Sequence, residues 1–172
     1  KAAVIDPAPK SPAESLQALR VRPGFQAELV VHEPLVVDPV AIDWGADGRL
    51  WVAEMADYPL GLDGNGKPGG RIRVLADSNQ DGVYDRSTVF LDGISFPTGV
   101  LTWGKGVLIT AAPEILYAED MDNDGKADVR RPLFTGFLEG NQQLRVNGLR
   151  VGWITGCIVP AAVIMAGMVR RA

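Results

Sequence analysis

The sequence has little of the chemistry that enzymes commonly use for nucleophilic or metal-assisted catalysis. Among its 172 residues are one cysteine, Cys157, and one histidine, His32. A single cysteine excludes an internal disulfide and a CxxC metal pair, and the sequence shows no nucleophile triad, phosphate-binding glycine loop or zinc site. A lone histidine at the end of an early predicted strand is more typical of a surface position than of a catalytic base.

Basic residues are too few and too scattered for a nucleic-acid-binding surface. The chain has 17 Lys and Arg residues against 21 Asp and Glu residues, which gives a formal net charge of −4. No stripe of basic residues with interleaved aromatic residues is present. We therefore expect no nucleic-acid partner.

Glycine and proline, in contrast, are abundant, at 20 and 12 residues. Their spread along a chain of globular composition favours many short strands joined by tight turns. One short helix is predicted near the start, because Ser11 can cap it, Pro12 suits its first position and Glu14 its third. Residues 1–10, rich in proline and alanine, are expected to form a flexible leader.

A four-strand pattern occurs twice in the sequence, after a first predicted strand at 25–32. In each copy a Trp-Gly pair, two further strands, an Asp-rich turn and a last strand follow in the same order. The two Asp-rich turns begin 43 residues apart, within the period of about 40–45 residues of four-stranded propeller blades. We predict an all-β partial β-propeller of two blades, at 39–95 and 97–138. The alternative is a β-sandwich with coincidental similarities.

The predicted strands of the first copy are 40–44, 49–55, 71–76 and 87–91, and those of the second are 98–103, 106–111, 114–119 and 131–135. The first copy carries an insertion, residues 58–70, and insertions of this sort often lie on a binding face. Glu54, Asp57 and Tyr58 precede or begin the insertion. They are either functional groups at a loop or buried acidic residues that cap its turns.

Both Asp-rich turns have oxygen ligands at the first, third, fifth and ninth places and glycine at the sixth, the pattern that Ca²⁺ requires. Neither is an EF-hand, because Thr88 and Arg131 replace the bidentate Glu at the twelfth place and strands flank the turns. A plain Asp-Gly hairpin turn with solvated carboxylates is the alternative. The candidate ligands are Asp77, Asn79, Asp81 and Asp85 in the first turn and Asp120, Asp122, Asp124 and Asp128 in the second.

Two later segments are also informative. Residues 140–149 are denser in amide side chains than a strand usually is, so they either line a polar site or form an ordinary loop. Residues 153–169 carry no charge and precede Arg170 and Arg171. Hydropathy alone makes this segment plausible as a short membrane anchor, although it contains Gly156, Pro160 and Gly167.

Several motifs from Ser11 to Arg150 resemble the N-terminal domain of the membrane-bound dehydrogenases, a family of large exported bacterial proteins. These motifs are Pro39-Val-Ala-Ile-Asp-Trp, Trp51-Val-Ala-Glu-Met, Asp57-Tyr-Pro, Gly70-Arg-Ile-Arg-Val-Leu, Phe96-Pro-Thr-Gly, Asp124-Gly-Lys-Ala-Asp and Asn147-Gly-Leu-Arg. The domain of that family is similar to the soluble quinoprotein glucose and sorbosone dehydrogenase propellers.

The resemblance implies a secreted protein of the periplasm or cell envelope that oxidises a sugar-like alcohol. Electrons would pass to pyrroloquinoline quinone (PQQ) or directly to a haem c domain farther along the full-length protein. The residues that match the polar stretch of the family, and thus its implied cofactor site, are Gln142, Gln143, Arg145 and Asn147. The dehydrogenase activity is itself an analogy from fold.

The sequence departs from the resemblance after Arg150. Members usually continue there with Gly-Leu-Asp-Asn-Trp-Val-Tyr and a segment rich in Gly and His. Reverse translation of residues 153–169, read one nucleotide earlier, permits Leu-Asp-Asn-Trp-Val-Tyr-Cys-Ala-Ser-Gly-Gly-His-His-Gly-Gly-Tyr-Gly. We therefore expect residues 151–172 to be an out-of-frame apolar tail, and a true membrane anchor is the alternative.

Three functional hypotheses follow from the sequence. The first is a truncated and inactive N-terminal piece of a quinoprotein-like dehydrogenase. The second is a calcium-stabilised propeller that only binds carbohydrate or protein, and it differs from the first in whether the restored protein reduces an artificial acceptor with sugars. The third is a small membrane-anchored interaction protein, which depends entirely on residues 153–169. Open sheet edges and the apolar tail predict poor solubility.

Overall fold

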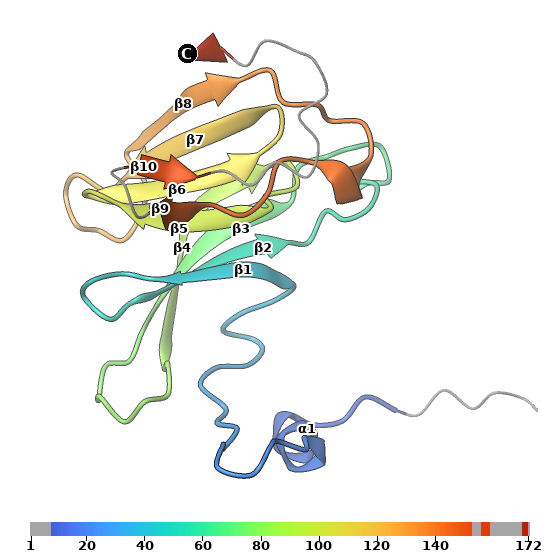
Figure 1. The fold of residues 1–172 in the computed structure, drawn as a ribbon, viewed down its shortest axis with the longest axis vertical. Helices are drawn as coiled ribbons and strands as arrows, with labels where there is room; N and C mark the ends of the chain where they lie inside the picture. The colour runs from blue at the N-terminus through green and yellow to red at the C-terminus, as the bar shows by residue number, and fades with distance from the viewer. Residues whose placement is uncertain (1–7, 153–155, 159–169, 172) are drawn as a thin grey trace, which may run out of the picture.

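The protein is mostly β-structure, arranged as two four-stranded antiparallel sheets and one short α-helix (Figure 1). The structure, a computed structural model, describes residues 8–152, 156–158 and 170–171. The first sheet has the order β1 (Pro39–Trp44), β2 (Leu50–Met55), β3 (Gly70–Ala76) and β4 (Arg86–Ile94). The second has β5 (Gly99–Trp103), β6 (Gly106–Ala111), β7 (Glu114–Glu119) and β8 (Val129–Thr135). The prediction of an all-β chain with two four-strand copies is confirmed.

The helix α1 (Pro12–Ala18) begins as the sequence predicts. The Ser11 hydroxyl accepts a hydrogen bond from the Glu14 amide, and the Glu14 carboxylate accepts one from the Ser11 amide at 2.8 Å. No residue of the helix is buried, and Figure 1 shows α1 set apart from the sheets at the end of a long connection. Because so short a helix gains little from its own hydrogen bonds, its cap is its main local stabilisation.

The strand predicted at 25–32 is wrong. These residues form loops and turns that continue as far as β1. Phe25 is 71% exposed, and the Val30 carbonyl accepts a hydrogen bond from the Tyr84 amide rather than from a neighbouring strand. Val31 near the end of the segment, together with Leu35 beyond it, packs on the first sheet as a loop rather than as a strand.

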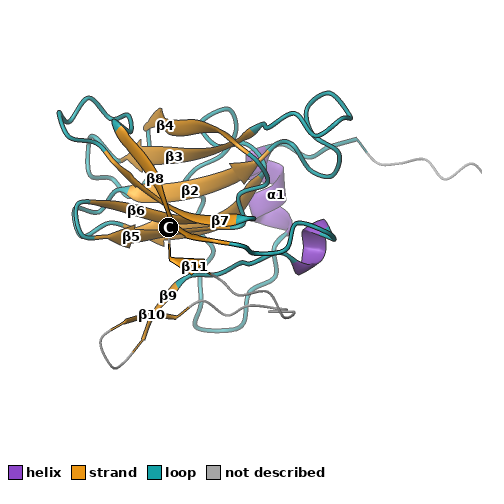
Figure 2. Ribbon diagram, turned by 90° about the horizontal axis from the view of Figure 1, so that it is seen from above, coloured by secondary structure: helices purple, strands orange, loops and turns teal. Residues whose placement is uncertain are grey.

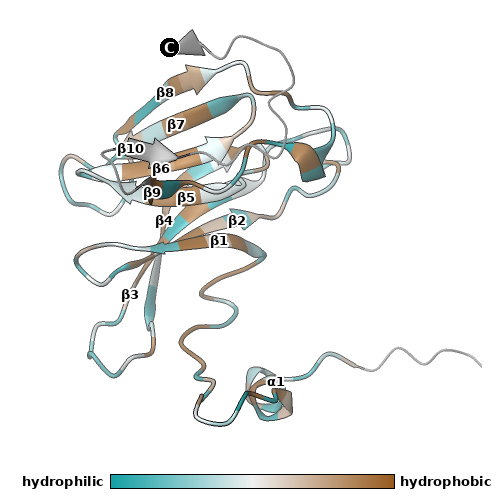
Figure 3. Ribbon diagram, in the orientation of Figure 1, coloured by the Kyte–Doolittle hydropathy of each residue, from teal (hydrophilic) through white to brown (hydrophobic). Residues whose placement is uncertain are grey.

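The core lies between the two sheets, which pack face to face. Trp51 and Phe90 of the first sheet meet edge to face, with ring centroids 4.7 Å apart. Val107 and Ile109 of the second sheet belong to the same buried cluster. Figure 2 shows the strands of the two sheets in neighbouring layers, and Figure 3 shows hydrophobic residues along them. The sheets are also joined at their first strands, where the Asp43 carboxylate accepts a hydrogen bond from the Thr102 amide at 2.7 Å.

The two sheets share a register. Trp51 pairs with Val74 as Leu108 pairs with Tyr117, and a β-bulge falls at the same place between the third and fourth strands of each sheet. The two sheets therefore use the same pattern of pairing and the same irregularity, which a chance likeness between sequence copies would not require.

One part of the predicted alignment of the copies is wrong. Trp44 and Trp103, which end the matching Trp-Gly segments, do not occupy equivalent places. Trp44 pairs with Leu50, whereas Trp103 pairs with Gly106 at the turn itself. The reason is turn length: five residues join β1 to β2, and two join β5 to β6.

The end of the chain adds three short strands, β9 (Arg150–Gly152), β10 (Gly156–Ile158) and β11 (Arg170–Arg171). β10 pairs with β9, and β11 pairs with β8. Apart from β10, the predicted apolar segment 153–169 lies outside the described residues, as does most of the predicted leader. Within the described part of the chain, no helix is long and apolar enough to cross a membrane.

Candidate functional site

Near its end, just before the connection to β3, β2 carries a buried carboxylate, Glu54, which is 0% exposed. It accepts hydrogen bonds from the Val37 amide at 2.7 Å and from Arg71 Nε at 2.5 Å. Arg73 Nε lies 2.9 Å from the other side of the same carboxylate as an ion pair. Two arginines and one amide thus balance the buried charge, so Glu54 anchors the root of the connection.

Asp57 ties this connection to the second sheet. It is also 0% exposed. Its Oδ2 atom accepts a hydrogen bond from the Phe96 amide at 2.8 Å and one from the Gly69 amide at 3.3 Å. Its Oδ1 atom has no partner among the described residues. Asp57 therefore links the start of the predicted insertion 58–70 and Gly69, near its end, to the segment that enters β5.

A groove of about 520 Å³ opens beside this anchor point. Its lining combines the start of β1, the end of β2 and the later polar stretch: Asp38, Pro39, Val40, Met55, Ala56, Tyr58, Gln142 and Gln143. Gln142 and Gln143 begin a 3₁₀ turn, η1 (Gln142–Leu144). Gln142 Nε2 donates to the Pro59 carbonyl at 2.8 Å, and Gln143 Nε2 donates to the Tyr58 hydroxyl at 3.4 Å. Two segments more than 80 residues apart therefore form one polar rim.

The other two predicted cofactor residues lie outside this rim. Arg145 is 7% exposed and stacks on the Phe96 ring at 4.6 Å. Its Nε and Nη2 atoms donate to the Glu139 carbonyl at 3.0 and 2.7 Å, and its Nη1 atom has no partner among the described residues. Asn147 is half-buried at the approach to β9. Arg145 therefore acts on the groove only indirectly: it packs on Phe96, whose amide donates to Asp57.

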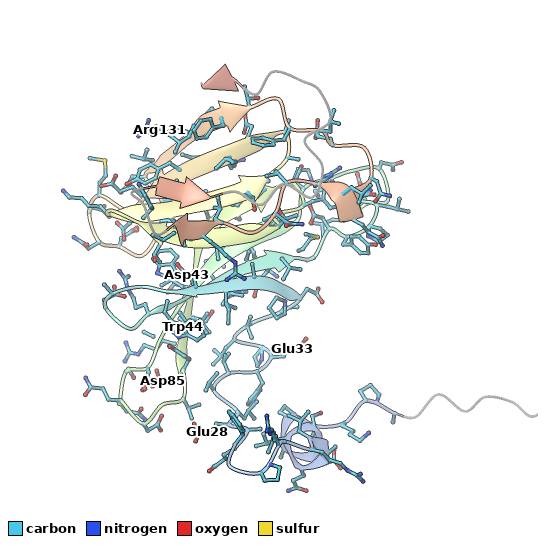
Figure 4. The ribbon with its side chains drawn as sticks, viewed as in Figure 1. Glu28, Glu33, Asp43, Trp44, Asp85 and Arg131 are labelled. Carbon is cyan, nitrogen blue, oxygen red and sulfur yellow. The ribbon has the colours of Figure 1, made fainter. Side chains whose placement is uncertain are left out.

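His32 does not take part in this groove. It lies beside α1 in a separate hollow, together with Glu28 and Glu33. Figure 4 shows Glu28 beside the helix, Glu33 farther along the connection toward β1, and Asp43 on the first sheet. This agrees with the prediction of a surface histidine.

The two Asp-rich turns have the same backbone shape. Gly82 and Gly125, at the sixth place of each, have φ values of +91° and +88°. The fourth places, Gln80 and Asn123, are also in the left-handed region at φ +60° and +63°. Glycine is the residue that adopts this conformation without steric cost, so the Asp-Gly pairs fix the bend. The first carboxylate of each turn accepts a hydrogen bond from the amide of the sixth residue, at 2.8 and 2.9 Å.

The second turn gathers three carboxylates. One oxygen from each of Asp120, Asp122 and Asp124 lies within 4.8 Å of the others. The turn is also fixed to the first sheet, because the Ala127 amide donates to the Phe90 carbonyl at 2.8 Å. In the first turn, Asn79 at the third place supplies an amide instead, and its Nδ2 donates to Asp81 at 3.0 Å. The second turn is thus the better candidate for a cation.

The carboxylates at the ninth places close the turns. Asp128 accepts a hydrogen bond from the Met121 amide at 2.7 Å, and Asp85 accepts one from the Ser78 amide at 2.9 Å. The Ser78 hydroxyl and amide lower the pKa of Asp85. A folded-state pKa below the ordinary value of 3.8 means that this stabilisation is present above that value and is lost as the pH falls through the folded-state pKa.

The pKa of Asp120 is lowered as well. Burial by itself would raise it, but hydrogen bonds from the amides of Gly125 and Asn123 outweigh that effect. The carboxylate therefore stays ionised to lower pH than an ordinary aspartate, the charge state that a cation ligand needs.

Comparison with known families assigns the chain. The family described as a domain of unknown function (DUF7133) matches residues 11–159. The chain belongs to this family. The matched range includes both sheets of the DUF7133 chain, the groove and both Asp-rich turns. No curated protein and no solved structure gives a significant match.

The sequence located parts of this site in the DUF7133 chain without showing that they meet. Tyr58, Gln142 and Gln143 were each candidates, and the structure brings them to one rim. Asp38, which also lines the groove, was missed. No sequence signal indicated it, because a residue before proline is expected to be extended, whereas the φ of Asp38 is +49°, in the left-handed region.

Proposed function

We propose that this DUF7133 chain is the opening part of an exported β-propeller dehydrogenase, and that its groove binds a sugar-like alcohol. The two equivalent sheets support the propeller, since each has the strand order and length of a blade. The observation that carries the binding proposal is the contact of the Gln142 amide with the Pro59 carbonyl and of the Gln143 amide with the Tyr58 hydroxyl at the rim of the groove.

The chemistry of the groove suits a neutral polyhydroxylated ligand. The Tyr58 side chain is half-exposed, so its ring offers a face for an apolar sugar surface. The Gln oxygens, the Tyr58 hydroxyl and the Asp38 carboxylate offer acceptors for hydroxyl groups. Among the described residues that line the groove none is Lys or Arg. A negatively charged ligand would therefore meet Asp38 without a compensating cation.

The same lining does not fit PQQ. The quinone carries three carboxylates, which call for cationic partners, and the groove has Asp38 in their place. Arg145 is the one cation among the predicted cofactor residues, but it is not in the lining, and it contacts the Glu139 carbonyl and the Phe96 ring. We therefore derive no step through the quinone. Transfer of electrons to a quinone or haem c domain stays a proposal for the full-length protein, based on the resemblance.

Sugar binding can be tested by calorimetric titration of the chain with D-glucose and myo-inositol. Gln142→Ala is expected to weaken binding about fivefold, because one hydrogen bond contributes about 1 kcal/mol. Gln17→Ala, on the exposed face of α1, is the matched control and should leave binding unchanged. Equal binding by both variants, or no heat with either ligand, would overturn the proposal.

A second candidate, a calcium-stabilised binding module, is favoured by the three gathered carboxylates of the second turn. We expect Ca²⁺ to raise the free energy of unfolding by about 2.7 kcal/mol at 100 times its Kd, if the turn binds the ion only when folded. Asp122→Asn should abolish most of that gain, and Asp92→Asn, at an exposed strand position, should keep it. Thermal unfolding with Ca²⁺ and with EDTA makes the comparison; identical midpoints in the two conditions would rule the calcium site out.

The location of the protein is also a proposal. Export to the periplasm or cell envelope follows from the resemblance alone, and attachment to a membrane would require the segment 153–169. Fractionation of cells that carry the gene in its native setting distinguishes an exported protein from a membrane-attached one.

A further inference from the structure

We infer that a third four-stranded unit packs on the outer face of the second sheet, and that the first strand of this unit begins within residues 147–151. The inference rests on the propeller proposed above and is independent of sugar binding. In each sheet we call outer the face that points away from the N-terminal segment 31–36, whether or not another sheet covers that face. In the first sheet this face carries Trp51, Val74 and Phe90, and the second sheet covers it.

The strand register identifies the corresponding face of the second sheet. Leu108 and Tyr117 form the cross-strand pair that matches Trp51 and Val74. Leu133 lies at the β-bulge of β8, as Phe90 lies at the bulge of β4. The outer face of the second sheet is therefore built from Leu108, Tyr117 and Leu133, which belong with Leu101 and Leu149 to one apolar cluster.

Leu149 lies on this second face as Val100 lies on the first. Val100 is the residue of β5 that joins the core with Trp51, and Leu149 packs with Leu101 and Leu108. The local sequence agrees, because Asn147-Gly-Leu149 matches Thr98-Gly-Val100. The segment is also fixed in place, since the Thr98 hydroxyl donates to the Val146 carbonyl. Residues 147–149 thus lead into the first strand of a third unit, as residues 98–100 lead into β5.

In the described part of the chain, the rest of the outer face of the second sheet is only partly buried. Val74 and Phe90 are 5% and 3% exposed under the second sheet. Their counterparts Tyr117 and Leu133 are only half-buried, and Arg131 stacks on the outer side of Tyr117 at 5.3 Å. The β5 and β6 side of the face is therefore covered and the β7 and β8 side is not, as expected if only the beginning of a unit is in place.

The face fits another unit of this repeat better than a second copy of the chain. A unit of the repeat would offer alternating aliphatic residues such as Val107 and Ile109. The other face of the first sheet is already covered by Val31, Leu35 and Val36, and its Glu54 is 0% exposed and paired with Arg71 and Arg73. A second copy would have to displace that covering segment to bring its first sheet against Leu108 and Leu133.

The test extends the chain by a copy of its own second unit. Residues 153–172 are replaced by a second copy of residues 104–138, which continues the strand that starts at Leu149. Amide hydrogen exchange at Tyr117 and Leu133 is expected to slow at least tenfold relative to the unaltered chain. In the matched control, the added copies of Ile109 and Leu116 are changed to lysine, and exchange should not slow.

A second variant tests the first strand in the unaltered chain. Leu149→Asp should speed exchange at Leu101 and Leu108 at least tenfold, whereas Val151→Asp, at a well-exposed position, should not. Equal exchange in the extended chain and its lysine control, an extended chain that aggregates, or no effect of Leu149→Asp would each overturn the inference. So would a concentration-dependent dimer of the unaltered chain that protects Tyr117. None of these readouts depends on sugar.

Discussion

Trp51→Ala is expected to lower the free energy of unfolding by about 3–5 kcal/mol, the usual cost of removing a large aromatic side chain from a core. Trp51 is buried between the two sheets and meets the Phe90 ring edge to face at 4.7 Å. The substitution removes that aromatic contact and leaves a cavity at the centre of the interface. Because Phe90 and the aliphatic residues of the second sheet share this cluster, both sheets should lose stability together.

Urea unfolding followed by circular dichroism measures the effect. Trp103→Ala is the matched control, because Trp103 is 42% exposed at the turn between β5 and β6. We expect the control to cost less than about 1 kcal/mol. Equal losses from the two substitutions would show that Trp51 is not at the centre of a shared core, and the face-to-face packing would then be wrong.

Glu54→Ala is expected to be nearly as damaging, at about 3–5 kcal/mol, the range found when one partner of a buried ion pair is removed. The variant would leave Arg73 and Arg71 with unpaired charge beside the first sheet and would remove the acceptor of the Val37 amide. Glu54→Gln keeps the shape and an acceptor, so it should recover part of the loss.

The exposed residue Glu28 provides the control, and Glu28→Ala should change the unfolding midpoint little. The N-terminal segment should respond specifically, because Val37 is held by Glu54. Amide exchange at Val36 and Val37 is therefore expected to speed up in Glu54→Ala. A variant as stable as the parent, with unchanged exchange there, would mean that the buried carboxylate is not an anchor.

The strands were predictable because they carry strong local signals. Runs of β-branched and aromatic residues lie between glycine and Asp-Gly turns, and the structure places a strand at each predicted run after residue 39. The run 25–32 failed because alternation alone does not supply a partner strand. Its Val30 carbonyl accepts a hydrogen bond from the loop before β4, and of its apolar residues Val31 packs on the first sheet while Phe25 is exposed.

The different strand pairing of Trp44 and Trp103 could not be predicted from the sequence for a related reason. Two equal sequence endings can belong to turns of different length, and only the pairing of backbone groups shows which residues are equivalent. The candidate site was predictable only in pieces. Tyr58 and Gln142 are 84 positions apart. The hydrogen bond from Gln142 to the Pro59 carbonyl depends on the fold around Asp57, which holds the Phe96 segment.

The burial of Asp57 and Arg145 and their contacts with Phe96 could not be predicted from the sequence. Asp57 and Arg145 each keep one polar atom without a partner among the described residues, and both contact Phe96. Sequence patterns show that such residues are polar, but burial and pairing arise only from the folded chain.

The most direct test of the sugar-binding groove is a titration of the ¹⁵N-labelled chain with D-glucose, followed by amide and side-chain NMR signals. We expect saturable shifts at Tyr58 and at the side-chain amides of Gln142 and Gln143, with little change at the Asp-rich turns. Shifts confined to other surfaces, or no saturable shift at any accessible glucose concentration, would contradict the sugar-binding proposal.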